Sequence, residues 1–144
     1  GNEIMHEGIA GSYEGHRLDF PGGFPGDKRD AFTPGGRTKQ ENEIYDYLKT
    51  LLHYRKNNPA LQNGKMMQFI PENGVYVFFR YNGEKTVMVI CNNNENTINL
   101  DTERFKERTY SFENGIDIIT KKKVGITGNV EVEGKRVMIL ELNP

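Results

Sequence analysis

The sequence predicts a mostly β protein: an antiparallel Greek-key β-sandwich preceded by one α-helix and a long glycine-rich loop. Three observations support this fold class. Residues 1–37 hold nine of the 16 glycines and show no hydrophobic periodicity. A single amphipathic segment follows over residues 38–57. From residue 65 onward, short apolar runs alternate with turn residues, as in antiparallel sandwiches and barrels.

Composition excludes several classes of function. The chain has 144 residues, enough for about one domain. It carries 19 Lys and Arg against 20 Asp and Glu, so no basic face for nucleic acid is expected. No apolar stretch approaches the roughly 20 residues that a membrane span requires. The single cysteine, Cys91, excludes an internal disulfide.

The first segment, residues 1–37, is predicted to be an irregular loop. Its stretch PGGFPGD, residues 21–27, is a series of turn-forming residues. Loops of this length inside compact domains are usually functional or disordered. We expect this one to be ordered by packing against the downstream domain, a second chain, or a further part of the protein.

Residues 38–57 form the one convincing helix. Thr38 and Glu41 have the spacing of a capping box, in which each side chain satisfies a backbone N–H of the first turn. Acidic residues precede basic ones along the segment, which suits the helix dipole. Asn58-Pro59 ends the helix, because the residue before proline avoids the α region. The apolar stripe consists of Ile44, Tyr45, Tyr47, Leu48, Leu51 and Leu52.

After a short connection at 58–64, residues 65–144 are predicted to form the β part. Asn82-Gly83 predicts a two-residue type I′ hairpin, because both turn positions need a positive φ. A turn at Glu133-Gly134 predicts a closing hairpin between the last two strands. The predicted strands are 66–70, 75–81, 85–92, 97–100, 109–112, 116–119, 124–126, 129–132 and 136–142.

No motif in the sequence supplies catalytic or metal chemistry by itself. The histidines His6, His16 and His53 are scattered, and neither a zinc motif nor a nucleotide-binding fingerprint is present. We therefore assign no catalytic residue, no metal ligand and no cofactor. Six carboxylates of the loop are interpreted as mostly turn-forming, solvated acids: Glu3, Glu7, Glu14, Asp19, Asp27 and Asp30.

Three stretches resemble one enzyme family. They are GNE at residues 1–3, RLDFPGGFPGDKRDAFTPGGRT at 17–38, and LLHYRKNNPALQNGK at 51–65. Together they resemble the end of the catalytic barrel in the α-amylase family of glycoside hydrolases. The resemblance is to the neopullulanase, cyclomaltodextrinase and Bacteroides-like starch-utilisation amylases, and it covers essentially the whole chain.

The resemblance implies a domain division. Residues 1–57 would be the C-terminal end of a (β/α)8 barrel, with the loop after strand eight at 1–37 and helix eight at 38–57. Residues 58–64 would connect it to a C-terminal all-β domain at 65–144. The chain begins with Gly1 and has no signal peptide, so we expect a segment of a longer polypeptide whose barrel is its partner.

The resemblance also implies a function for that parent. It would hydrolyse α-glucosidic bonds of starch or maltooligosaccharides with retention. The catalytic carboxylates would precede residue 1, so this segment would be inactive alone and would help to close the barrel. Calcium in the parent is compatible with the family, but this segment shows no site for it. The Bacteroides-like relatives imply a periplasmic or cell-surface location in a Gram-negative bacterium.

One motif of the family bears on substrate binding. Many relatives carry D-P-x-x-R in the loop after strand eight, and the aligned stretch here is Tyr13-Glu14-Gly15-His16-Arg17. Arg17 fits the pattern, whereas Tyr13 occupies the aspartate position. The resemblance implies that Arg17 binds substrate, with Tyr13 and Asp19 nearby. A structural pairing of Arg17 with Asp19 or another loop acid is the competing hypothesis.

Two other functions remain open from the sequence. A carbohydrate-binding module would need exposed aromatic residues, and Tyr76, Phe78, Tyr81 and Tyr110 are the candidates, because the chain has no Trp. A structural domain that assembles a homodimer is the other alternative. Preference for α-1,4 or α-1,6 bonds, and for starch, cyclodextrin or pullulan, is not encoded in any pattern we recognise.

Overall fold

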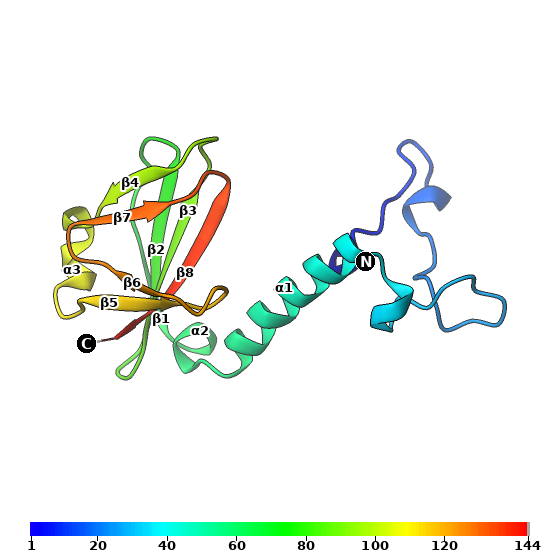
Figure 1. Cartoon of the computed structure of the whole chain (residues 1–144), viewed down its shortest axis with the longest axis horizontal. Coiled ribbons are helices and arrows are strands. Elements are labelled where there is room, and N and C mark those ends of the chain that lie inside the picture. The colour runs from blue at the N-terminus through cyan, green and yellow to red at the C-terminus, as the bar shows by residue number, and fades with distance from the viewer. Residues whose placement is uncertain (144) are drawn as a thin grey trace. The chain divides into compact units, whose positions relative to one another are not determined.

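The computed structural model describes residues 1–143 and divides the chain into two compact units, Gly1–Leu52 and the part from His53 onward (Figure 1). The division falls inside the long helix α1, Lys39–Lys56. The first unit is therefore the glycine-rich segment with most of this helix. The second unit contains the last turn of α1 and all the strands.

The first unit is irregular before α1, as the sequence predicts. Its only regular elements among residues 1–38 are three single-turn 3-10 helices: η1 at Asn2–Ile4, η2 at Glu14–His16 and η3 at Pro34–Gly36. The segment is nevertheless packed. Ile4 and Ala31 are buried, and the rings of Phe20 and Phe32 lie 4.7 Å apart. Packing between nearby side chains thus stabilises a segment that has little regular backbone hydrogen bonding.

Helix α1 begins with the predicted capping box. The Thr38 backbone N–H donates to Glu41 Oε2 at 2.7 Å, and the Glu41 N–H donates to Thr38 Oγ1 at 3.2 Å. The helix ends at Lys56, close to the predicted end at residue 57. Its apolar stripe is incompletely covered, since Ile44, Tyr47 and Leu52 are exposed.

The connection at 58–64 contains an additional helical turn, α2, at Pro59–Gln62. Asn58 caps it, because its side-chain oxygen accepts from the Ala60 N–H at 3.0 Å. Pro59 is favourable at the first helical position, where its missing N–H would have no partner within the helix. The proline that ends α1 therefore also starts α2.

The second unit is an antiparallel β-sandwich, which confirms the predicted fold class. Figure 1 shows its two sheets and the α3 turn beside the β4–β7 pair. The larger sheet has the order β1-β2-β3-β8-β5-β6, and the smaller sheet pairs β4 with β7. The strands are β1 Lys65–Gln68, β2 Val75–Tyr81, β3 Thr86–Asn92, β4 Ile98–Asp101, β5 Asn114–Asp117, β6 Lys123–Gly125, β7 Asn129–Val132 and β8 Arg136–Asn143.

The core lies between the two sheets. Alternate residues of β2, β3 and β8 point into it, which is the two-residue period of a half-buried strand. The opposite wall comes from β7 and from Phe105 of the 3-10 helix η4, Glu103–Phe105. Phe105 packs edge-on to Phe69 with ring centroids 4.9 Å apart. The fully buried apolar members include Phe79, Met88, Ile90, Phe105, Val130, Val132 and Leu140.

The predicted strand at 109–112 is wrong. The chain forms the helical turn α3, Lys106–Thr109, and then a turn. Burial of Phe105 fixes the start of this turn, and Thr109 Oγ1 donates to the Phe105 carbonyl at 3.2 Å. Thr109 and Phe112 favour strands by propensity, but packing around Phe105 overrides that preference.

The hairpin between β2 and β3 differs from the predicted type I′ turn. Tyr81 pairs with Thr86, so the loop has four residues, and neither Asn82 nor Gly83 has a positive φ. Asn82 stabilises the turn through its side chain instead. Its Oδ1 accepts from the N–H groups of Glu84 at 3.0 Å and Lys85 at 2.8 Å.

The predicted closing hairpin is also wrong. β7 pairs with β4, whereas β8 pairs with β3 and β5, so the chain changes sheet between Val132 and Arg136. Asn92 holds this crossing. Its Nδ2 donates to the carbonyls of Val132 at 3.1 Å and Glu133 at 3.0 Å. A side chain buried in β3 thus fixes a turn 40 residues later in the sequence.

Candidate functional site

The candidate substrate contacts from the sequence lie around the short helix η2. Tyr13 and Arg17 flank this turn, which brings the Arg17 guanidinium to 4.6 Å from the centroid of the Tyr13 ring. Tyr13 is 72% exposed, so the pair stands at the surface. Asp19 is exposed and makes no hydrogen bond or ion pair with either residue among the contacts described.

The Tyr13–Arg17 pair offers hydrogen-bond donors and an aromatic ring at the surface of the loop. A cation over an aromatic ring is weakly attractive at an exposed position, about 0.5–1 kcal/mol. The stacking orients the guanidinium and leaves its N–H groups available as donors. Within residues 1–143 Arg17 makes no ion pair with a loop acid. The structure therefore provides no support for the competing structural pairing of Arg17.

Two loop acids are turn-forming, as the sequence predicts. Asp27 Oδ2 accepts from the N–H groups of Gly22 and Phe24, both at 3.0 Å. Asp30 Oδ1 accepts from the Phe32 N–H at 3.0 Å. Both carboxylates accept hydrogen bonds from backbone N–H groups of the glycine-rich stretch. In this conformation they therefore do not form a facing pair of catalytic acids.

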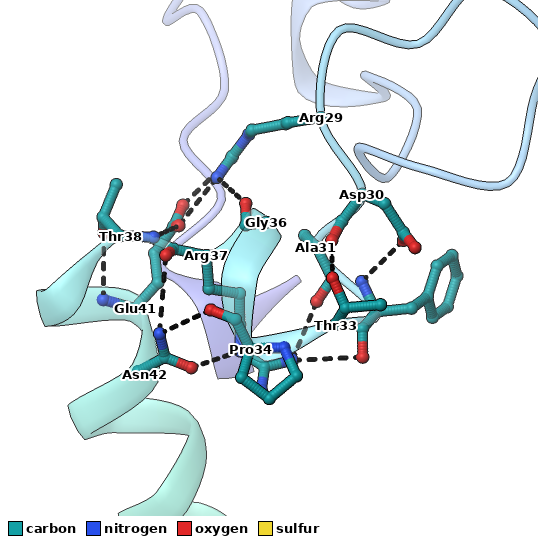
Figure 2. A network of polar contacts seen from close by, with 11 residues as sticks. Arg29, Asp30, Ala31, Thr33, Pro34, Gly36, Arg37, Thr38, Glu41 and Asn42 are labelled. Carbon is teal, nitrogen blue, oxygen red and sulfur yellow. Dashed lines mark hydrogen bonds and ion pairs between the residues drawn. The ribbon is translucent and has the colours of Figure 1, made fainter.

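A polar network joins the loop to the start of α1 (Figure 2). Arg29 donates to the Glu41 carboxylate from its two terminal guanidinium nitrogens, Nη1 at 2.7 Å and Nη2 at 2.9 Å. The same carboxylate caps the helix through the Thr38 N–H. Glu41 is largely buried, so these bonds replace water. The hydrogen bonds from Arg29, followed by the one from Thr38, lower the pKa of Glu41 to about 2.

Arg37 is the second hub of this network, and sequence reasoning missed it. Its guanidinium donates to the Ala31 carbonyl at 2.9 Å and to Asn42 Oδ1 at 2.9 Å, as Figure 2 shows. It also lies 3.8 Å from the centroid of the Tyr45 ring. Arg37 is only 8% exposed, so it is a structural cation. Arginine on the loop side of a helix cap is a weak sequence indicator of such a role.

A second polar cluster lies at the other end of α1, within the second unit. Tyr54 Oη donates to Glu141 Oε2 at 2.6 Å, and Lys85 Nζ donates to Glu141 Oε1 at 2.7 Å. Asn58 Nδ2 contacts both Tyr54 Oη at 2.9 Å and Glu141 Oε2 at 3.3 Å. The cluster fixes the last turn of α1 to strand β8 and to the end of the loop that precedes β3.

Burial and charge act in opposite directions in this cluster. Burial by itself raises the pKa of Glu141, but hydrogen bonds from Lys85 and Tyr54 outweigh it and leave the pKa below its usual value. Burial, followed by the bond to Glu141, raises the pKa of Tyr54. Tyr54 therefore stays a neutral donor and Glu141 a charged acceptor. The cluster is a structural junction with no free nucleophile.

The aromatic candidates for sugar binding do not form one platform. Tyr76 and Phe78 lie side by side on β2, with ring centroids 5.5 Å apart. Tyr81 is covered by the guanidinium of Arg108, which lies 3.8 Å from its ring centroid. Tyr110 is 78% exposed and stands alone in the α3 turn.

Residues 1–143 contain neither a cluster of metal-binding side chains nor a membrane-spanning helix. No group of three or more His, Cys, Asp or Glu side chains is arranged to hold a metal ion. In the same residues, no helix combines the length and apolar character that crossing a bilayer requires.

Comparison with known proteins identifies the second unit. Residues 66–141, more than half of the chain, match the family described as the cyclomaltodextrinase C-terminal domain. The chain belongs to this family. This confirms the resemblance seen in the sequence, and the cyclomaltodextrinase C-terminal domain corresponds to the sandwich from β1 to β8.

Individual relatives agree with this identification. A cyclomaltodextrin glucanotransferase of Klebsiella oxytoca is 39% identical over 61 residues, which are 42% of this chain and 9% of the relative. An AmyP variant solved in complex with maltotriose has a TM-score of 0.62 at 14% identity, over 74% of this chain and 22% of its own. An Anoxybacillus α-amylase has a TM-score of 0.58 at 18% identity, over 76% of this chain and 26% of its own.

The identities to the solved structures are below 20%, so they show the fold alone. The chain spans about a tenth of the curated relative and about a quarter of the structural ones. This cyclomaltodextrinase C-terminal domain is thus a C-terminal domain of the α-amylase family, with relatives that are glycoside hydrolases.

Proposed function

We propose that this chain is the C-terminal part of a retaining α-glucan hydrolase that degrades starch or maltooligosaccharides. The observation that carries the proposal is the family match over residues 66–141. A solved relative bound to maltotriose and a curated relative that acts as a cyclomaltodextrin glucanotransferase support the substrate class. The partner of the sandwich is then the catalytic barrel of the same polypeptide.

The catalytic carboxylates belong to that barrel in this proposal. Retaining glycoside hydrolysis needs two carboxyl groups about 5–5.5 Å apart on either side of the scissile bond. Two loop acids, Asp27 and Asp30, close turns, and Glu41 at the start of α1 binds Arg29. We therefore expect the 144-residue chain to be inactive alone.

The role of the sandwich in this proposal is mechanical. Its core is apolar and continuous, and the Tyr54–Glu141 junction is built to hold the end of α1 in place. A rigid domain attached to the final helix would protect that edge of the barrel from unfolding. Its removal is expected to reduce solubility before it reduces chemistry, because a covered apolar face becomes exposed.

The loop makes the contribution nearest to substrate. In (β/α)8 enzymes the active site is built from the loops that follow the strands. We assign Arg17 as a donor to sugar hydroxyl groups, with the Tyr13 ring orienting its guanidinium and offering a face to the sugar. Asp19 is assigned the outer rim of the same contact. Mutation of Arg17 would then weaken substrate binding and leave the fold intact.

The first experiment measures reducing-sugar release from maltoheptaose and pullulan by the 144-residue chain and by the full reading frame that contains it. Activity in the full protein and none in the chain supports the proposal. Turnover by the chain alone would overturn the assignment of the catalytic groups. Sugar binding by the inactive chain would instead favour a carbohydrate-binding module. A dimer of the chain that does not bind sugar would favour a structural domain that assembles a homodimer.

The second experiment tests the loop. In the full protein, Arg17→Ala is expected to raise KM for maltoheptaose by about tenfold, the loss of one charge-assisted hydrogen bond. Lys28→Ala is the matched control, because Lys28 is an exposed cation of the same loop. Unchanged KM and kcat in Arg17→Ala would remove Arg17 from the substrate site.

A further inference from the structure

Four Asn-Gly pairs occur in the chain, at residues 63–64, 73–74, 82–83 and 114–115. In such a pair the backbone nitrogen of the glycine can attack the Cγ carbon of the asparagine, because glycine has no Cβ that obstructs the approach. The reaction needs the two groups held close together and a backbone that is free to rearrange. The surroundings of each pair therefore decide which of them reacts.

Two of the pairs are held by tight packing of the glycine. A Cβ on Gly64 would overlap the Ala60 carbonyl oxygen, and the Gly64 carbonyl accepts from Arg80 Nη2 at 3.0 Å. Gly115 is buried in β5, which is paired with β6 on one side and β8 on the other. Neither glycine has room to move toward the preceding side chain.

A third pair forms the turn between β1 and β2. Asn73 and Gly74 both have a positive φ, 50° and 74°. Asn94 Nδ2 donates to the Asn73 carbonyl at 2.9 Å, and the Asn93 N–H donates to the Gly74 carbonyl at 2.9 Å. Rotation of this turn would break both bonds, so this pair is also held.

The fourth pair, Asn82-Gly83, lies in the open loop between β2 and β3. Gly83 is exposed, a Cβ there would meet nothing within 4 Å, and its N–H has no acceptor within residues 1–143. Asn82 Oδ1 accepts from the N–H groups of Glu84 at 3.0 Å and Lys85 at 2.8 Å. Among the described residues, this is the one asparagine of the four whose side-chain oxygen accepts backbone hydrogen bonds. The two donors polarise the carbonyl that the Gly83 nitrogen would attack.

We propose that Asn82 is a site of spontaneous deamidation, at which the chain modifies itself. The Gly83 nitrogen forms a bond to Asn82 Cγ and loses its proton, while the bond from Cγ to Nδ2 breaks and ammonia leaves. Negative charge develops on Oδ1 during the attack, and the two N–H donors already bind this atom, as in an oxyanion hole. Water then opens the cyclic imide at either carbonyl and leaves aspartate or isoaspartate. The reaction consumes water and releases ammonia, and it needs no other reactant.

The modification reaches the junction at the end of α1 through Lys85. This residue closes the same four-residue loop and donates to Glu141 Oε1 at 2.7 Å. Isoaspartate adds one backbone carbon to the loop, whose ends stay fixed by the pairing of Tyr81 with Thr86. The longer loop displaces Lys85 and weakens its contact with Glu141. Aspartate keeps the loop length and the acceptor at position 82, so the aspartate form keeps this contact.

The test measures deamidation in the folded 144-residue chain. The chain is incubated in neutral buffer made with heavy-oxygen water and is then digested with trypsin in ordinary water, so that only deamidation before digestion carries the label. Trypsin leaves the four pairs in separate peptides: 57–65, 66–80, 81–85 and 109–121. Mass spectrometry then yields four rates from one sample. The chain unfolded in guanidinium chloride supplies the four reference rates.

The ratio of folded to unfolded rate is the deciding quantity. We expect the fold to slow the other three pairs by about tenfold or more, because they react only when the backbone opens. Peptide 81–85 should keep or exceed its unfolded rate. Suppression of Asn82 equal to that of the other three pairs would overturn the proposal, and so would a faster reaction at any of them.

Glu84→Pro tests the backbone donors, because proline has no N–H to donate to Asn82 Oδ1. We expect deamidation at Asn82 to slow by about tenfold, the loss of one donor to the developing charge. Glu84→Gln is the matched control, since it changes the side chain and keeps the N–H. Equal rates in the two variants would overturn the role of the donors. If Glu84→Pro fails to fold, the comparison of the four pairs in the unmodified chain still decides.

The effect on the junction is tested with chain aged in neutral buffer and separated by ion exchange. The isoaspartate form should unfold at a lower urea concentration than fresh chain, whereas Asn82→Asp should keep the midpoint of fresh chain. In Lys85→Ala, which already lacks the contact with Glu141, isoaspartate should lower the midpoint less. An unchanged midpoint in the isoaspartate form, or an equal decrease in Lys85→Ala, would overturn the coupling to Glu141.

Discussion

The Tyr54 hydroxyl lies 2.6 Å from Glu141 Oε2, so the end of the long helix is bonded to the last strand across 87 positions of sequence. Asn58 contacts both groups and also caps α2. Three polar side chains thus define where α1 stops, where α2 starts and which strand they meet. The junction is specific because a half-buried carboxylate without donors would be costly.

Tyr54→Phe tests this junction. The change removes one donor to a charged acceptor and keeps the ring, so we expect a loss of about 1–2 kcal/mol in the free energy of unfolding of the second unit. Urea titration followed by circular dichroism measures it. Tyr110→Phe is the control, because that hydroxyl is exposed; its effect should stay within about 0.5 kcal/mol. Equal effects of the two variants would contradict the assigned role.

The lowered pKa of Glu41 predicts how the stability of the loop changes with pH. Its pKa in the folded chain, about 2, lies below the ordinary value of 4.5. The Arg29–Glu41 pairing therefore stabilises the loop fully above pH 4.5, and this stabilisation is lost as the pH falls from 4.5 toward 2. The Thr38 amide resonance should report a midpoint well below 4.5. In the Glu41→Gln variant the Thr38 amide resonance should not titrate in this way. A midpoint near the ordinary value of 4.5 in the unmodified chain would exclude the Arg29–Glu41 pairing.

Neighbouring glycines make a sharp test of the loop packing. A Cβ at Gly36 would overlap the backbone carbonyl of Asp30, whereas a Cβ at Gly35 would meet nothing within 4 Å. Gly36→Ala should therefore displace the Arg29 and Arg37 contacts and speed proteolysis within residues 21–37. Gly35→Ala should leave the cleavage rate unchanged. Identical proteolysis of the two variants would show that the loop is not packed in this way.

Asn92→Asp tests the segment between Val132 and Arg136, where the chain passes from the smaller sheet to the larger one. Asn92 is 3% exposed, and its Nδ2 donates to three carbonyls, those of Asn96, Val132 and Glu133. An aspartate of the same shape would replace these donors with a charged acceptor, at a cost of about 3 kcal/mol or more. Asn129→Asp, on the exposed side of β7, is the control. Similar unfolding midpoints in urea would refute the role of Asn92.

Local features were predictable because their partners are close in sequence. The capping box depends on two residues three apart, Thr38 and Glu41, and the structure has both bonds. The bounds of β2 and β7 follow from turn residues on either side of an apolar alternation, and they match the prediction. The family resemblance came from motifs of the same local kind, and the match over residues 66–141 confirms it.

The candidate site was predictable only in part. The sequence placed Tyr13 and Arg17 four residues apart, and η2 brings them into contact. It did not identify Arg29 or Arg37, because their partners Glu41 and Ala31 become neighbours only after the loop folds back. Nor did it identify Glu141, whose position in β8 has the same alternation as any outward-facing residue.

The sequence by itself determined that one long helix precedes a run of short strands, where that helix is capped, and the bounds of β2 and β7. Tertiary structure alone decided that β8 lies beside β3, that β7 joins β4, and that the segment around Thr109 becomes a helical turn. The physical reason is that an apolar alternation specifies a face to be covered but not the strand that covers it. That choice depends on burying Phe105 together with its apolar neighbours while the buried backbone groups find hydrogen-bond partners.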